Sequence, residues 1–309
     1  MLPLISPDDT LNTVYQNYIS ALRTSNFSGD IHTDYATRLT AATDNSIYQV
    51  IPQAIIYPHS TKDISIALKL STKPEFTSVK FAARGGGTGT NGQSLSNSII
   101  VDCSRHMRKI IELNTEENWV RVQPGITPDQ LNEYIKSSGL YFAPEISPGN
   151  RATIGGMINT DACGNGSKIL GRTSDHVIGL TCVISNGNIL NTETETEQHL
   201  KHELETVLSQ HQSLIHEKFV ETPRTLNGYN LKKAFNKKLN INHLICGSEG
   251  TLGIISECKL HLTTIPKIKK LLLIRYNSFD DALRAPEITS EINPFVIETI
   301  DENLINLAR

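Results

Sequence analysis

Five glycines fall within nine residues in the stretch Arg84-Gly85-Gly86-Gly87-Thr88-Gly89-Thr90-Asn91-Gly92. Glycine carries an entropic cost on folding, so such a series indicates positive φ angles or a close approach to the main chain. The apolar run from Val79 to Ala83 predicts a strand before it, and Ile99 to Asp102 predicts a strand after it. Bare backbone N–H groups at a strand exit, beside the fixed charge of Arg84, favour a phosphate-bearing ligand.

Two familiar phosphate-binding motifs do not explain this stretch. Gly87, Gly89 and Gly92 formally match the dinucleotide fingerprint of a Rossmann unit, but that turn leads directly into a helix. Here residues 93–98 are polar, without a helical apolar period, and a strand follows them. A P-loop is excluded because no Gly-Lys-Ser/Thr follows the glycines. The remaining interpretation is a phosphate loop between two strands of another fold.

The composition is that of an ordinary globular chain. Of its 309 residues, 38% are hydrophobic and 20% are charged, and the net charge is −3. A nucleic-acid partner is not expected, because it would require a basic stripe. No apolar run approaches the roughly 20 residues of a membrane span. The five cysteines contain no Cys-x-x-Cys pair, which favours the reducing cytoplasm and excludes an iron–sulfur or zinc site built from these cysteines alone.

Two local patterns predict defined secondary structure. Thr127-Pro128-Asp129-Gln130 is a capping box with proline at the first helical position, so a helix is expected from Pro128 to Ser138, ending at Gly139. The runs Val177 to Ser185 and Asn188 to Leu190 are joined by Asn186-Gly187. This pattern predicts a β-hairpin with a type I′ turn.

Two more glycine-rich motifs accompany the first. They are Pro148 to Gly164, which contains Thr153-Ile154-Gly155-Gly156, and Gly247 to Ile254, which contains Gly250. Each combines glycine with small hydroxyl and amide residues, which suits close backbone approach to a long, polar cofactor. A single loop of this kind is usually only a turn, but three are hard to explain as turns.

Together the three motifs resemble the FAD-binding (PCMH-type) domain of the vanillyl-alcohol oxidase and flavin-linked D-2-hydroxyacid dehydrogenase family. The stretches 44–52 and 226–231 also fit this family. The resemblance runs from about Tyr35 to Arg309 and is greatest to the N-terminal part of the long bacterial D-2-hydroxyglutarate dehydrogenases, whose flavin half is fused to an iron–sulfur domain.

The resemblance implies an α+β protein. Residues 1–45 are expected to be an N-terminal helical segment. Residues 46–268 are expected to form a PCMH-type FAD-binding domain of two α/β subdomains. Residues 269–309 are expected to begin a truncated α+β cap domain that binds substrate.

The resemblance also implies a set of cofactor-binding residues on three walls. The diphosphate is expected beside Arg84, Gly85, Gly86, Gly87, Thr88, Gly89, Gly92 and Gln93. The other side of FAD is expected beside Pro148, Thr153, Gly155, Gly156, Asn159 and Thr160, with Val177 near the adenine and Gly250 and Ile254 completing the wall. Because the first loop has Thr88 and no histidine, FAD is expected to be bound non-covalently.

The reaction implied is the oxidation of a D-2-hydroxy acid, of the D-2-hydroxyglutarate or D-lactate class, to the 2-oxo acid by hydride transfer to FAD. Such chemistry also needs a base and a cationic group for the carboxylate. The sequence offers no convincing base, and no clustered cations outside the phosphate loop and the run Lys267 to Lys270, so the catalytic residues are unknown. The family's divalent metal and iron–sulfur cluster are expected only in a missing C-terminal part, and this fragment is expected to bind FAD without full catalysis.

Two alternatives remain open. The chain could be a stand-alone FAD-binding subunit of a multi-chain glycolate or lactate oxidase-type complex, with a partner chain that carries the cap and the iron–sulfur half. It could also be a non-enzymatic remnant. The electron acceptor is not indicated by the sequence.

Several polar residues suggest chemistry but favour ordinary roles. His199, His202 and Glu203 share one helical turn, yet their surroundings are polar and indicate a solvated face rather than a metal site. His106 is expected to be an ordinary loop or core histidine. Asp161 is interpreted as a turn residue rather than a general base, and Cys163 as a small residue in a tight loop.

Overall fold

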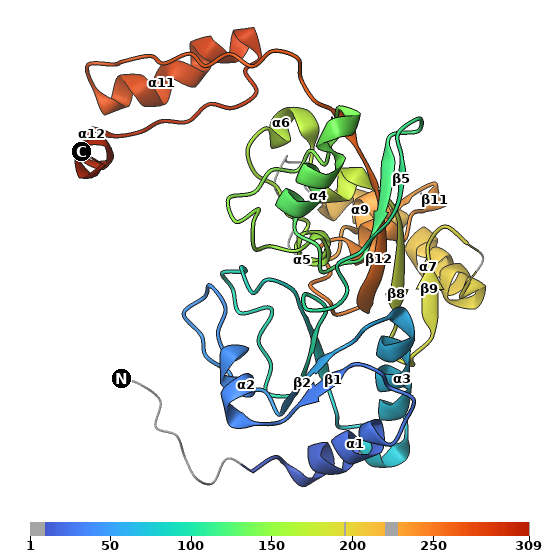
Figure 1. The fold of residues 1–309 in the computed structure, drawn as a ribbon. Helices are drawn as coiled ribbons and strands as arrows, with labels where there is room; N and C mark the ends of the chain where they lie inside the picture. The colour runs from blue at the N-terminus through green and yellow to red at the C-terminus, as the bar shows by residue number, and fades with distance from the viewer. Residues whose placement is uncertain (1–9, 195, 220–227, 309) are drawn as a thin grey trace.

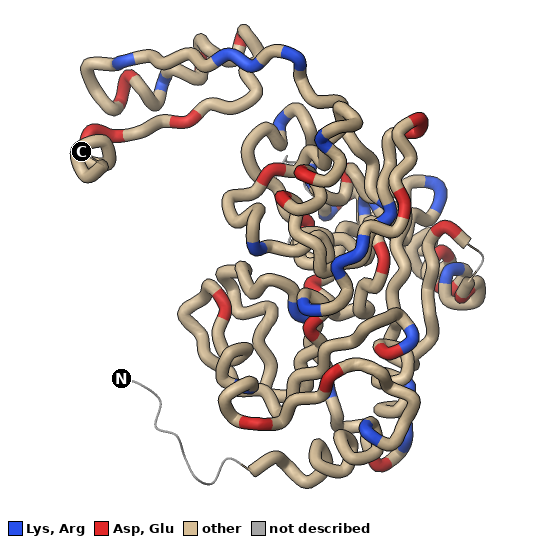
Figure 2. The backbone as a smooth tube through the Cα atoms, in the orientation of Figure 1, with Lys and Arg blue, Asp and Glu red and all other residues tan. Residues whose placement is uncertain are grey.

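The computed structural model describes residues 10–194, 196–219 and 228–308. Within these residues the chain forms two packed subdomains and a C-terminal segment that extends away from them (Figure 1). Lys and Arg are interspersed with Asp and Glu over both subdomains (Figure 2). No helix in the described part of the chain is long and apolar enough to cross a membrane.

The first subdomain contains a four-stranded sheet in the order β1-β2-β4-β3. Strands β2, β4 and β3 are parallel, and β1 is antiparallel to β2. The strands are β1 (Asp30–His32), β2 (Ala54–Tyr57), β3 (Phe81–Arg84) and β4 (Ile99–Asp102). The glycine stretch therefore connects two neighbouring parallel strands, and β3 begins two residues later than the sequence predicts.

Helices on this sheet close the first core. They are α1 (Thr13–Arg23), α2 (Tyr35–Thr40), α3 (Thr61–Ser71) and the 3-10 helix η1 (Pro74–Phe76). Helix α1 buries Tyr18, Ile19 and Leu22 in the same cluster as the strands, and the Tyr18 hydroxyl donates to the Ala67 carbonyl at 2.7 Å. The described part of the N-terminal helical segment thus shares the core of the first subdomain. The predicted start of the flavin domain at residue 46 stays a prediction.

The second subdomain contains a five-stranded antiparallel sheet in the order β5-β6-β12-β8-β9. The strands are β5 (Ile110–Asn114), β6 (Trp119–Val122), β8 (Val177–Val183), β9 (Ile189–Asn191) and β12 (Ile254–His261). The central strand β12 is far from its neighbours in sequence, so the subdomain is complete only when the chain returns after residue 250. A large apolar cluster packs this sheet against the helices α4 (Pro128–Ile135), α5 (Ile154–Asn159) and α10 (Asn242–Ile245).

Short elements complete the second subdomain. They are η2 (Lys136–Ser138), β7 (Leu140–Tyr141), α6 (Ser167–Leu170), η3 (Thr173–His176), α7 (Gln198–Gln210), α8 (Gln212–Lys218), α9 (Leu231–Ala234), β10 (Phe235–Asn236), β11 (Lys238–Leu239) and β13 (Thr263–Thr264). Strand β10 pairs with β11, and β13 pairs with β7.

The predicted capping box is present at α4. The Thr127 hydroxyl accepts from the Gln130 N–H, the Gln130 side chain accepts from the Thr127 N–H, and Gly139 ends the helical stretch with φ 73°. The hairpin is present too, but its predicted type I′ turn is wrong. Of the two predicted turn residues, Asn186 and Gly187, only Gly187 has positive φ. The Ile184 N–H donates to the Asn188 carbonyl and the Ile184 carbonyl accepts from the Gly187 N–H, so the loop is longer than two residues. Gly187 packs on the backbone of Lys69 in α3, and this tertiary contact favours the longer loop.

The C-terminal segment holds α11 (Phe279–Thr289), η4 (Ser290–Ile292) and α12 (Glu302–Leu307). None of its described residues, 269–308, is buried. It extends beyond α6 in Figure 1, and Phe295 lies against Gly166 of the second subdomain. Its assignment as the start of a cap domain stays a prediction.

Candidate cofactor-binding site

A cavity of about 690 Å³ lies where the two subdomains meet. This volume is within the range of roughly 300–1,000 Å³ typical of cofactor pockets. Most of the predicted binding residues line it: Arg84, Gly85, Gly86, Gly87, Thr88, Gly89, Gln93, Pro148, Thr153, Gly155, Gly156, Asn159, Thr160 and Ile254. The fold therefore brings the first glycine stretch, the second motif and the start of β12 to one site.

Two of the glycines are required by contact between loops. A Cβ on Gly85 would overlap the Thr153 hydroxyl, and a Cβ on Gly86 would overlap the Arg151 carbonyl. Both glycines have ordinary backbone angles, since Gly87 (φ 62°) and Gly92 (φ 77°) are the members of this stretch with positive φ. The first two walls of the cavity thus lie in direct contact at these two glycines.

Arg84 supports the loop from the first subdomain. Its guanidinium donates to the Thr43 carbonyl at 2.7 Å, and to the Ala41 carbonyl and the Ser94 hydroxyl at 3.3 Å. Burial lowers the pKa of Arg84, and the nearby carboxylates of Asp102 and Asp44 act in the opposite direction. These bonds fix the guanidinium beside Gly87, while its contact with an anion stays a prediction.

The stretch 44–52 that carries part of the resemblance lies directly on the glycine loop. The Asp44 carboxylate accepts from the Ser94 hydroxyl at 3.2 Å, and the Asn45 N–H donates to the Gly89 carbonyl at 3.1 Å. The Tyr48 ring covers the position where Gly92 would carry a side chain. Of the stretch 226–231, which also carries part of the resemblance, Leu226 and Asn227 lie outside the described residues.

The opposite wall is formed by the first turn of α5. The Thr153 hydroxyl caps the helix by accepting from the Gly156 N–H at 3.3 Å. A Cβ on Gly156 would meet only that hydroxyl, at 3.3 Å, so Gly156 presents bare backbone to the cavity. The buried Asn159 side-chain oxygen has no hydrogen-bond partner among the described residues. A bare surface with an unsatisfied polar atom fits a polar cofactor.

Three predicted residues lie outside the set that lines the cavity. Gly92 lies under Tyr48, Val177 opens β8, and Gly250 (φ 80°) lies beside Ala83 and Asn159. Their contact with a cofactor stays a prediction.

Other lining residues were not anticipated from the sequence. They are Ala83, Thr90, Ser94, Cys103, Pro124, Glu145, Ile146, Ser147, Ala152, Met157, Ala162, Cys163, Gly164, Asn165, Glu249 and Ile255. Gly164 could have been found from the sequence, because it belongs to the second glycine motif. In the structure a Cβ on Gly164 would overlap the Glu145 carbonyl. The stretch 145–147 therefore lies against the loop at 163–165. Glu249 follows the third motif's first glycine and donates its N–H to the Asn159 carbonyl at 2.8 Å.

Asp161 fixes the turn that follows α5. It is buried, has φ 46°, and pairs with Arg172 through a 3.0 Å contact between the carboxylate and Nε. Its other carboxylate oxygen accepts from the Ser174 N–H at 2.9 Å. These bonds give Asp161 a structural task at the cavity's edge, as its interpretation as a turn residue requires.

Comparison with known families identifies the region that supplies most of this cavity's lining. Residues 52–193 match the family described as FAD binding domain. This region is an FAD-binding domain. The predicted resemblance, the predicted α+β fold and FAD as the cofactor are confirmed. The contact of FAD with the residues that line this cavity stays a prediction.

Similar proteins share the architecture over different lengths. The chain is 45% identical over its whole length to a D-2-hydroxyglutarate dehydrogenase of Pantoea ananatis, of which it spans 32%. It is 30% identical to the glycolate oxidase subunit GlcD of Bacillus subtilis, over 82% of this chain and 47% of that one. A solved alkyldihydroxyacetonephosphate synthase matches 84% of this chain and 43% of its own, with a TM-score of 0.62 at 21% identity, and so shares the fold.

Proposed function

We propose that this chain is the FAD-binding part of a flavoprotein that oxidises a D-2-hydroxy acid of the D-2-hydroxyglutarate class to the 2-oxo acid. The observation that carries the proposal is the 45% identity, over the whole chain, to a D-2-hydroxyglutarate dehydrogenase. The cavity supports it, because the motifs that predict flavin binding converge there.

The chain's own residues would bind and orient the cofactor. The backbone of Gly85 to Gly89 would hold the diphosphate, with Arg84 keeping the loop in shape. Gly156 would allow close approach on the opposite wall, and the Asn159 side chain would gain a partner there. When bound, FAD supplies the acceptor for the hydride that leaves C2 of the hydroxy acid.

The remaining catalytic needs are not met by the cavity's charged residues. Arg84 is bonded to backbone carbonyls, and the other charged lining residues, Glu145 and Glu249, are acidic. A carboxylate substrate requires a cationic partner, and its hydroxyl proton requires a base. We therefore assign those tasks to a cap domain that begins at residues 269–309. Its exposed apolar side chains, among them Leu271, Leu273 and Leu307, need a covering surface.

Reconstitution tests the binding half of the proposal. The purified 309-residue chain should take up FAD, show a flavin absorbance spectrum, and release all flavin on denaturation, because attachment is non-covalent. It should not turn over D-2-hydroxyglutarate with an artificial acceptor. A chain that takes up no flavin contradicts the proposal, and turnover by the chain alone contradicts the assignment of catalysis to a cap.

A chimaera tests the oxidative half. This chain joined to the remaining two-thirds of the Pantoea ananatis relative should oxidise D-2-hydroxyglutarate and not its L enantiomer. The intact relative, prepared in parallel, is the positive control. A chimaera that folds and binds FAD but is inactive while the control is active would refute the substrate assignment.

A second candidate is a dedicated FAD-binding subunit that works with a separate chain. The similarity to a protein described as a subunit, GlcD, favours it. Co-purification of a partner that confers turnover on the FAD-loaded chain would distinguish it from the first candidate.

We further propose that the flavin domain extends from about residue 46 to residue 268, because the central strand β12 (Ile254–His261) lies beyond the matched region. We keep the cytoplasm as the proposed location. The five cysteines, Cys103, Cys163, Cys182, Cys246 and Cys258, are all free thiols, as a reducing compartment would maintain.

A further inference from the structure

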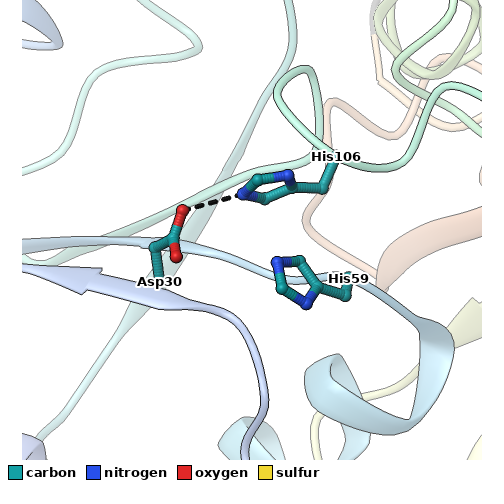
Figure 3. A group of neighbouring side chains, drawn as sticks. All are labelled: Asp30, His59 and His106. Carbon is teal, nitrogen blue, oxygen red and sulfur yellow. Dashed lines mark hydrogen bonds and ion pairs between the residues drawn. The ribbon is translucent and has the colours of Figure 1, made fainter.

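Three metal-ligating side chains from separate parts of the sequence meet at one edge of the first sheet. Asp30 opens β1, His59 lies in the turn between β2 and α3, and His106 lies in the turn after β4. One ligand atom of each lies within 4.8 Å of the other two. Figure 3 shows a ring nitrogen of His59 facing the space between the Asp30 carboxylate and the His106 ring.

We propose that Asp30, His59 and His106 bind a divalent transition-metal ion such as Zn²⁺. Two imidazoles and one carboxylate are a frequent donor set for zinc, with the fourth position taken by water. His59 is exposed and the other two are half-buried, so solvent reaches the site. The resemblance implies that the family's divalent metal lies outside this chain, whereas this site lies within it, and none of its three residues lines the cavity.

The separations of the three donors can be compared with those around a bound ion. Ligand atoms about 2.0–2.1 Å from a tetrahedral Zn²⁺ lie roughly 3.3 Å from one another. The His106 Nε2 and the Asp30 Oδ2 are 2.8 Å apart, so this pair needs to separate slightly. The His59 and His106 rings stand edge to face, with centroids 4.3 Å apart. The three donors lie within 4.8 Å of one another, so binding requires the more distant donors to move closer to one ion.

The supporting residues hold the three donors in place without the metal. Buried Asp63 accepts from the His59 N–H at 2.9 Å and from the Ser28 N–H at 2.8 Å. One carboxylate thereby fixes both the turn that carries His59 and the approach to β1. The turn of His106 is anchored by fully buried Met107, whose carbonyl accepts from the Gly125 N–H at 2.7 Å. Such support reduces the ordering cost of binding.

Arg105 opposes the metal. Its guanidinium lies 3.6 Å from the Asp30 Oδ2 and also covers the Tyr57 ring at 4.8 Å. The donors therefore carry a single negative charge that Arg105 partly offsets. Removing the Arg105 charge should therefore strengthen metal binding. If the three residues were instead held together only by the ion pairs of Asp30, removing that charge would weaken their association.

Calorimetric titration of the reduced, metal-free 309-residue chain with Zn²⁺ tests the proposal. The parent chain and all its variants carry Cys163→Ser, because Cys163 is the cysteine that is not buried and its thiol could itself bind Zn²⁺. The parent should show one saturable site, and Zn²⁺ should raise its melting temperature, since an ion that binds only the folded state stabilises it. His59→Ala should weaken Zn²⁺ binding at least about tenfold. This exposed side chain is not needed for folding, because its supporting bond uses the backbone N–H.

Matched controls separate this site from incidental histidine binding. His199→Ala and His202→Ala change exposed histidines on α7 and should leave Zn²⁺ affinity unchanged. Arg105→Gln should tighten binding severalfold. Absence of a saturable site in the parent, unchanged affinity in His59→Ala, or an equal loss in the α7 controls would each overturn the proposal. No flavin is present, so the result is independent of the proposed oxidation.

Discussion

Two glycines of the cavity should respond to the same substitution in different ways. In Gly156→Ala the new methyl group would enter the cavity and would meet only the Thr153 hydroxyl, at 3.3 Å. In Gly86→Ala it would overlap the Arg151 carbonyl, which belongs to the backbone of the facing loop. The first change should therefore affect FAD binding, and the second should affect folding.

The magnitudes follow from these contacts. Alanine is favoured over glycine in a helix by up to about 1 kcal/mol, so Gly156→Ala should change the unfolding free energy of the flavin-free protein by less than that. Crowding a packed site costs about 1–3 kcal/mol, which raises the FAD dissociation constant about 5- to 150-fold. Gly86→Ala should lose about 1–3 kcal/mol of stability or more, because two backbone segments must separate.

Urea unfolding of the flavin-free variants and FAD titration by flavin fluorescence measure the two effects. Wild-type affinity for FAD in a folded Gly156→Ala variant would refute the placement of the cofactor in this cavity. Wild-type stability of Gly86→Ala would refute the account of how its walls are joined.

Three further predictions concern stability and access. In native protein at alkaline pH, a thiol reagent should label Cys163 first, and bound FAD should slow this labelling. Cys163 lines the cavity and is half-buried, whereas burial raises the pKa values of Cys103 and Cys182 to about 12. If FAD did not slow the labelling of Cys163, the placement of FAD in this cavity would be contradicted. Burial would raise the pKa of Glu193, but bonds from Arg121 and Lys259 outweigh it and lower the pKa below its usual 4.5. This stabilisation is present above pH 4.5 and is lost as pH falls through the lowered pKa. Glu193→Gln should therefore lower the unfolding free energy by roughly 1 kcal/mol in urea melts at pH 7, and by progressively less in acid. A loss that does not depend on pH would show that the charge is not responsible. Gly187→Ala should lower the melting temperature more than Gly139→Ala. Both glycines have positive φ, but a Cβ on Gly187 would strike the backbone of α3, whereas a Cβ on Gly139 would enter open space. Equal losses would mean that only the backbone strain matters, at about 1–2 kcal/mol.

Local signals in the sequence determined much of this protein. The capping box at Thr127 and Gln130 determined the start of α4, because both hydrogen bonds close within four residues. The glycine stretch between two apolar runs predicted a loop between two strands, and β3 and β4 are indeed parallel neighbours. The three glycine motifs predicted a long, polar cofactor, because bare backbone beside small polar residues permits close approach, and their resemblance to a known family specified FAD.

Tertiary structure alone decided the features that depend on distant contacts. Gly86 faces Arg151, Gly187 packs on Lys69, and β12 enters between β6 and β8. No short-range pattern encodes these contacts, because each joins residues that are far apart in the chain. The same reason hid the cluster of Asp30, His59 and His106: each residue is unremarkable in its own segment, and only the parallel arrangement of β2 and β4 beside β1 brings the three side chains to one edge of the sheet.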